Sequence, residues 1–122
     1  MKNVKGLIFF YNAQSGISNA ILDYVHKIFS PSTYDCNLCS LTYNNFGMIN
    51  QWKKFIRSIK IPVHFQYADH LNTYGIDIDS ALPAIFTLNG EFFLSAKKIN
   101  SCTTLDELIN EVRVKIRFHK EN

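Results

Sequence analysis

The stretch LPAIFTLNGE, residues 82–91, carries the most specific structural signal in the chain. Its Asn89-Gly90 pair lies between two runs that are rich in β-forming residues, 84–88 and 91–95. An Asn-Gly pair in this setting is typical of a tight hairpin, because both positions accept the positive φ that the turn requires. The two runs are therefore predicted to be neighbouring antiparallel strands.

The segments that precede this hairpin have their own periodicities. Residues 4–11 are rich in Leu, Ile, Phe and Val without helical spacing, which indicates a buried strand that ends in the turn 12–16. Apolar residues at three- and four-residue steps predict amphipathic helices over 17–28 and 48–59. Alternation over 63–67 predicts a half-buried strand.

Two segments lack a sustained period. Residues 30–45 are predicted to be an ordered loop with an extended piece over 34–41, and residues 69–80 a loop or short helix. At the end of the chain, Thr104 and Glu107 have the spacing of a capping box. A last helix is predicted there, with the buried stripe Leu105, Leu108, Ile109, Val112 and Ile116.

This order of elements predicts an α/β fold in a single domain, residues 1–122. We expect a mixed central sheet of about four strands flanked by helices, with an inserted loop and helix at about 30–60 after the first helix. Hydrophobic residues make up 47% of the chain, which is enough for a core without disulfides.

Charge and composition exclude several classes of partner. The net charge is +3, and the densest basic stretch lies at the end of the last predicted helix, where cations complement the helix dipole. The expected partner is thus a protein or peptide, not nucleic acid or a membrane. A short N-terminal apolar run and an odd number of cysteines, three, favour a cytoplasmic location. No cofactor is predicted.

Three pieces of the second half resemble thioredoxins: Tyr74-Gly75-Ile76, Leu82-Pro83-Ala84-Ile85-Phe86 and Leu88-Asn89-Gly90-Glu91. The resemblance covers about half of the chain. It implies a thioredoxin-like three-layer fold in which Pro83 is a cis-proline that packs against the active-site turn.

The same resemblance implies that the usual redox centre is missing. In thioredoxins a Cys-x-x-Cys pair follows the first long strand directly, at the start of a helix. Here that position reads Asn12-Ala13-Gln14-Ser15-Gly16, in which Ser15 supplies the hydroxyl. Asn12, Ser15, Leu82 and Pro83 are therefore expected to form a surface that binds an extended peptide without thiol chemistry.

The chain is also similar to a family of short uncharacterised bacterial proteins that share the run SPSTYDCNLC, residues 30–39. Some relatives are labelled GTPases. A phosphate-binding loop requires Gly-Lys followed by Ser or Thr, and this sequence contains no Gly-Lys pair. GTPase activity is therefore not expected.

Cys36 and Cys39 form a Cys-x-x-Cys pair that the sequence leaves open to three interpretations. The pair could cycle between dithiol and disulfide, with Cys36 as the attacking thiol and a thiol–disulfide oxidoreductase as the resulting enzyme class. It could hold a metal ion with Cys102 or a histidine. It could also be two small apolar fillers that anchor the loop. The separation of the two sulfurs, the exposure of the pair and its distance from Pro83 together decide among the three interpretations.

Overall fold

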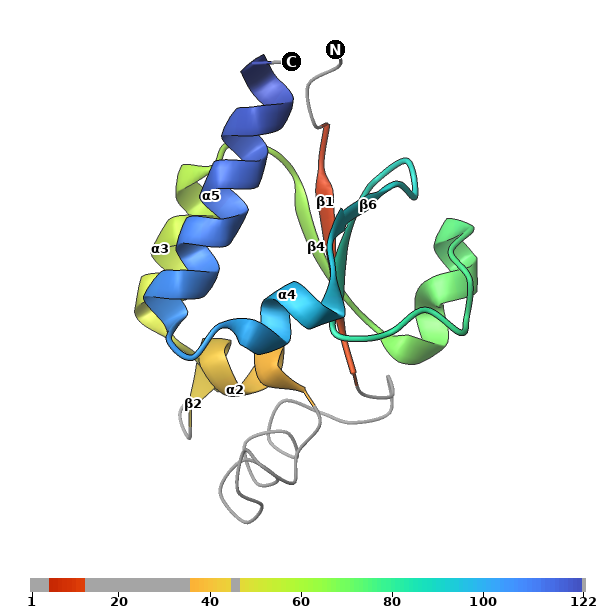
Figure 1. The fold of residues 1–122 in the computed structure, drawn as a ribbon, viewed down its shortest axis with the longest axis horizontal. Coiled ribbons are helices and arrows are strands. Elements are labelled where there is room, and N and C mark those ends of the chain that lie inside the picture. Colours follow the sequence, from red (N-terminus) through yellow and green to blue (C-terminus); the bar gives the residue numbers. More distant parts are fainter. Residues whose placement is uncertain (1–4, 13–35, 45–46, 122) are drawn as a thin grey trace.

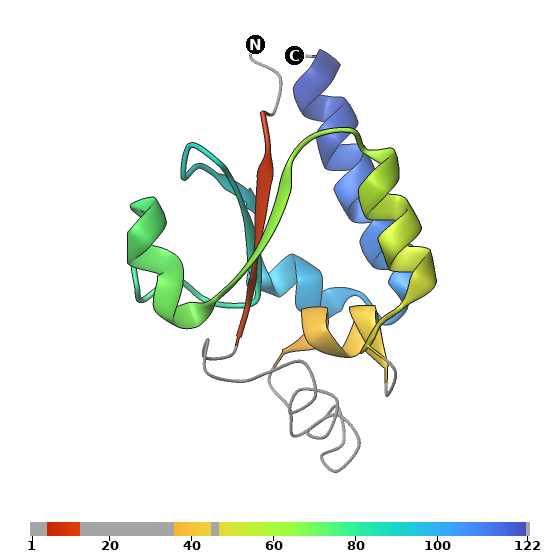
Figure 2. The same ribbon diagram turned by 180° about the vertical axis from the view of Figure 1, so that it is seen from behind.

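The structure is a computed structural model, and it describes residues 5–12, 36–44 and 47–121. The predicted helix over 17–28 lies outside the described residues, and so does Ser15. The described chain is an α/β fold with a mixed four-stranded sheet in the order β4-β1-β5-β6. Figures 1 and 2 show helices α3 (Asn50–Ser58) and α5 (Leu105–Glu121) on one face of this sheet. The 3-10 helix η1 (Ala68–Tyr74) lies on the other face.

Strand β1 (Leu7–Tyr11) is the centre of the sheet, and all five of its residues are buried. It runs parallel to β4 (Val63–Tyr67) on one side and antiparallel to β5 (Ala84–Thr87) on the other. The apolar sequence of β1, in which the Tyr11 hydroxyl is the one polar side-chain group, explains this position, since a strand covered on both faces has no side exposed to water.

The predicted hairpin is confirmed. Strand β5 pairs antiparallel with β6 (Phe92–Leu94), and Gly90 in the connecting turn has a φ of 84°. The Thr87 nitrogen donates to the Glu91 carbonyl at 2.8 Å, and the Gly90 nitrogen donates to the Thr87 carbonyl at 2.9 Å.

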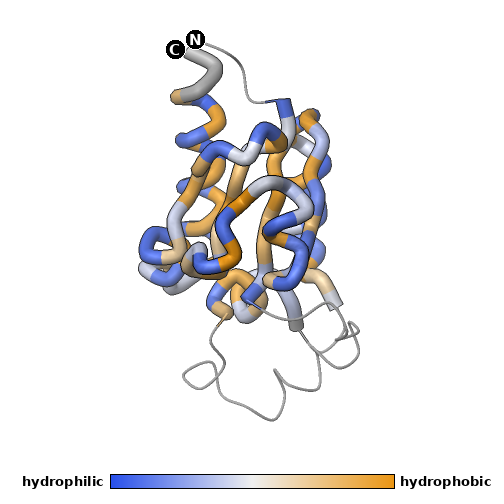
Figure 3. The backbone as a smooth tube through the Cα atoms, turned by 90° about the vertical axis from the view of Figure 1, so that its right-hand side faces the viewer, coloured by the Kyte–Doolittle hydropathy of each residue, from blue (hydrophilic) through white to orange (hydrophobic). Residues whose placement is uncertain are grey.

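Alternate residues of β1 contribute to two separate cores. Leu7, Phe9 and Tyr11 belong to the larger core, which also contains Trp52 and Phe55 of α3. Ile8 and Phe10 belong to the smaller core beneath η1. This division follows from the period of two along a strand. Figure 3 shows hydrophobic residues along the strands and a mixture of both kinds along α5.

Two of the helices predicted from periodicity, those over 48–59 and at the end of the chain, are present as α3 and α5. Helix α3 buries Trp52 and Phe55, while its lysines and arginine are exposed. Helix α5 starts at the predicted cap, where the Glu107 nitrogen donates to Thr104 Oγ1 at 3.2 Å. A further short helix, α4 (Ala96–Ser101), was not predicted. None of the helices in the described ranges is long and apolar enough to cross a membrane.

The prediction of a loop with an extended piece over 34–41 was wrong. Residues Asn37–Thr42 form the helix α2, and a small hairpin of β2 (Tyr43–Asn44) and β3 (Gly47–Met48) follows. Six residues span less than two helical turns, so they are too few to show a 3.6-residue period. Helix α2 lies beside α4 at one end of the sheet (Figure 1).

The left-handed backbone conformation just after α3 can be tested by substitution. Lys60 follows the last residues of α3 with a φ of 57°, a left-handed conformation that favours glycine. Lys60→Gly should therefore raise the free energy of unfolding by about 0.5–1 kcal/mol. Lys54→Gly, at an exposed position inside α3, should lower it by about 1 kcal/mol. Urea denaturation measures both, and a loss of stability in both variants would contradict the described geometry.

Candidate functional site

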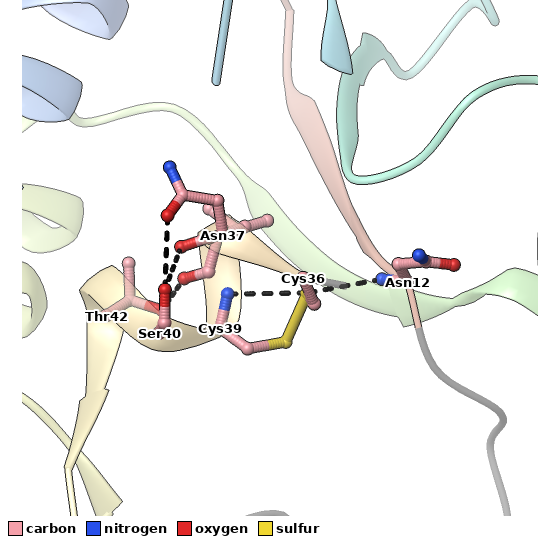
Figure 4. Close-up of a disulfide and its surroundings, with 7 residues drawn as sticks. Asn12, Cys36, Asn37, Cys39, Ser40 and Thr42 are labelled. Carbon is pink, nitrogen blue, oxygen red and sulfur yellow. Dashed lines mark hydrogen bonds between the residues drawn. A yellow bond between two sulfur atoms is a disulfide. The ribbon is translucent and has the colours of Figure 1, made fainter. Parts of the chain in front are cut away.

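Cys36 and Cys39 are joined by a disulfide across the start of α2 (Figure 4). Cys36 is the residue that caps the helix, and Cys39 lies in its first turn, with their Cα atoms 5.3 Å apart. A Cys-x-x-Cys spacing suits this geometry, because residues three apart in a helix lie on the same side. Both cysteines are fully buried, with 0% of their surface exposed.

The Cys36 sulfur accepts two backbone hydrogen bonds. The Asn12 nitrogen and the Cys39 nitrogen each lie 3.4 Å from Cys36 Sγ. Asn12 directly follows β1, so the sulfur lies at the carboxyl end of the central strand. Helix α2 is only six residues long, and these two direct N–H contacts therefore matter more than its dipole.

Pro83 lies at the same end of the sheet. The β1–β5 register pairs Phe10 with Ala84, so one further step along it sets Pro83 opposite Tyr11, the neighbour of Asn12. The peptide bond between Leu82 and Pro83 is cis, as predicted. Pro83 is buried, and Leu82 packs half-buried against the smaller core.

The structure places the pair relative to the first strand, which the sequence left undecided. The pair lies in an insertion along the chain, and its position in space could not be predicted. Cys36 contacts Asn12 across a sequence separation of 24 residues. Such a contact depends on the tertiary fold and not on position along the chain. Asn12, Cys36 and Cys39 come together, and Pro83 directly precedes the adjacent strand β5. Ser15 is outside the described residues.

Asn37, between the two cysteines, is a site residue that sequence reasoning missed. Its side-chain Nδ2 donates to the carbonyl of Ile99 at 2.8 Å and to that of Cys102 at 2.9 Å. Its Oδ1 accepts from Ser40 Oγ at 3.2 Å. These contacts connect the first turn of α2 to the end of α4. No local pattern reveals a partner 62 residues away.

A cluster of aromatic rings borders the site on the β1 side. The Tyr11 ring meets those of Tyr43 and Tyr67 at centroid distances of 5.8 and 6.0 Å. Burial is the main cause that raises the pKa of Tyr11 well above its usual value, and the neighbouring Tyr43 adds to this. The phenol of Tyr11 is therefore neutral at physiological pH.

The third cysteine, Cys102, follows α4 and is a buried free thiol. Its sulfur lies 3.5 Å from the Lys98 carbonyl, to which the thiol donates. Within residues 5–12, 36–44 and 47–121, no three His, Cys, Asp or Glu side chains come close enough together to hold a metal ion. The metal interpretation therefore has no ligand set in this part of the chain.

Comparisons with protein-family models, curated proteins and solved structures give no match for this chain.

The environment of Cys102 predicts low reactivity. Burial raises the pKa of its thiol, and the carboxylates of Glu111 and Glu107 raise it further. In the oxidised protein, where Cys102 is the free thiol, Glu111→Gln should move the pH midpoint of iodoacetamide labelling downward. Glu91→Gln, in the exposed hairpin turn, is the control and should leave the midpoint unchanged. Equal midpoints in the wild type and both variants would contradict the role of Glu111.

Proposed function

We propose that the chain is a thioredoxin-like protein in which Cys36 and Cys39 carry out thiol–disulfide exchange. One observation carries the proposal: the Cys36 sulfur lies 3.4 Å from the backbone nitrogens of both Asn12 and Cys39. The resemblance to thioredoxins supports it, since in that family the active pair also lies at the end of the first long strand, beside a proline.

The two N–H groups give Cys36 the role of attacking thiol. A thiolate is the reactive form of cysteine, and hydrogen bonds to the charged form favour it. Each hydrogen bond to a charged group contributes about 1.5–3 kcal/mol. Two of them offset much of the several kcal/mol that burial of an unpaired charge costs. Cys36 is fully buried, so its thiolate depends on both donors.

The exchange follows from these roles in two balanced steps. The Cys36 thiolate attacks one sulfur of a substrate disulfide, a mixed disulfide forms, and the other substrate sulfur leaves as a thiolate that takes up a proton. The Cys39 thiol then loses its proton and attacks the Cys36 sulfur. The Cys36–Cys39 disulfide forms, and the second substrate thiolate leaves. Two electrons pass to the substrate, and a dithiol reductant restores the pair.

Access to the pair is the main constraint on this function. Neither cysteine has any exposed surface, so exchange requires local opening of the chain around the start of α2. Local openings of this kind involve only part of a domain and do not require global unfolding. The rate of exchange is therefore expected to be limited by this opening.

The same burial favours a second candidate function, a non-catalytic module that binds an extended peptide at the surface around Leu82 and Pro83. In that case the only role of the disulfide is to hold the first turn of α2 in its conformation. The half-buried Leu82, which lies two residues before the start of β5, is the residue of this surface that an incoming peptide would contact.

An insulin-reduction assay with dithiothreitol as the electron source separates the two functions. The wild type should accelerate insulin reduction above the background, and Cys36→Ser should reduce the rate to that background. Cys102→Ser is the matched control and should retain the wild-type rate. When reduced Cys39→Ser is freed of dithiothreitol before insulin is added, it should accumulate the mixed disulfide at Cys36, which mass spectrometry detects.

Background-level rates in both the wild type and Cys36→Ser would contradict the exchange function. Fluorescence anisotropy with an extended, cysteine-free peptide then tests the second candidate. Equal peptide binding by the wild type and Cys36→Ser would support the binding module, because that function does not use the Cys36 sulfur.

A further inference from the structure

We infer that Asn37 is a positioning residue for Cys36, and that its side chain biases the Cys36–Cys39 pair toward the dithiol form. The inference rests on the proposed function, because it concerns the same exchange. Asn37 lies between the two cysteines, and Figure 4 shows its amide on the other side of α2 from the sulfurs. It does not touch the reacting atoms, so any effect must act through the backbone of the first turn.

The amide of Asn37 uses its hydrogen-bonding groups in a defined orientation. An NH₂ group supplies two donors, and Nδ2 lies within 2.9 Å of two carbonyl oxygens, those of Ile99 and Cys102. The Oδ1 atom faces the Ser40 hydroxyl at 3.2 Å. The reverse orientation would set Oδ1 against two carbonyls, so the contacts themselves fix which way the amide points.

The two carbonyls belong to a well-anchored part of the fold. Ile99 is fully buried in the larger core, and its carbonyl also accepts the Cys102 nitrogen at 3.1 Å at the end of α4. Asn37 thus holds a short helix to an element that comes some 60 positions later in the chain. A six-residue helix has little stability of its own, so tertiary contacts of this kind determine the shape of its first turn.

The shape of that turn determines the hydrogen bonds to Cys36. The Cys39 nitrogen reaches the Cys36 sulfur only while residues 36–39 keep their present conformation. In the reduced protein this contact stabilises the Cys36 thiolate, whereas in the disulfide the sulfur carries no charge and gains less from it. Asn37 therefore stabilises the reduced form more than the oxidised form.

The test is equilibrium titration of the full chain in glutathione buffers. In this reaction two glutathione thiols reduce the Cys36–Cys39 disulfide to two thiols, and one molecule of oxidised glutathione forms. Asn37→Ala should shift the equilibrium constant about three- to tenfold toward the disulfide. That change corresponds to a potential about 15–30 mV more negative. The pH midpoint of Cys36 alkylation in the reduced protein should move upward.

Two further variants complete the test. Ser101→Ala removes one hydrogen bond from the exposed face of α4, that from Ser101 Oγ to the Lys98 carbonyl, and should leave both readouts unchanged. Asn37→Ser, whose hydroxyl is too short for both carbonyls, should shift both readouts as Asn37→Ala does. It decides the outcome if circular dichroism shows that Asn37→Ala does not fold.

The outcomes separate this inference from the proposed function. A wild type that exchanges with glutathione, together with an unchanged constant in the folded Asn37 variants, would overturn the role of Asn37 alone. A shift toward the dithiol would overturn it as well. A wild type whose pair does not exchange with glutathione in any buffer would overturn both.

Discussion

Burial of β1 between β4 and β5 is the constraint on which the rest of the structure depends. The strand exposes none of its five residues, and its alternate side chains contribute to both cores. Its partner strands come from distant parts of the sequence, residues 63–67 and 84–87. The register of each pairing determines which residues lie at each end of the sheet. As a result, Asn12, Pro83 and the Cys36 sulfur all lie at the carboxyl end of one strand. The site is thus a consequence of how the sheet is paired.

Sequence patterns among neighbouring residues predicted most of the helices and strands. The site around Cys36 depends on tertiary contacts, which such patterns do not reveal. The Asn89-Gly90 turn, the apolar period of α3 and the Thr104 cap each arise from neighbouring residues, so the sequence contained them. Helix α2 was missed because it is too short to show a period. The contact between Asn12 and Cys36 was missed because its two ends are 24 residues apart. A thiol capping its own helix is also not a recognised start signal, since Ser, Thr, Asp and Asn are the usual caps.

The proposed exchange depends on a balance between burial and hydrogen bonding. Full burial disfavours a charged sulfur, whereas two backbone donors favour it. Both donors are backbone groups, one at the end of β1 and one in the first turn of α2, so this stabilisation depends on the conformation of the backbone at these two places. In the alternative of a purely structural disulfide, the contact from the Cys39 nitrogen only caps α2, and a neutral, bonded sulfur is a weak acceptor for both donors.

The most direct test of this account follows the backbone amides of Asn12 and Cys39 by NMR while the reduced protein is titrated with base. The account predicts that the proton shifts of both amides change with one common midpoint, and that Cys36→Ser abolishes this change. If neither amide responds to ionisation of Cys36, or if the same change persists in Cys36→Ser, the two donors do not stabilise the thiolate and the central claim is wrong.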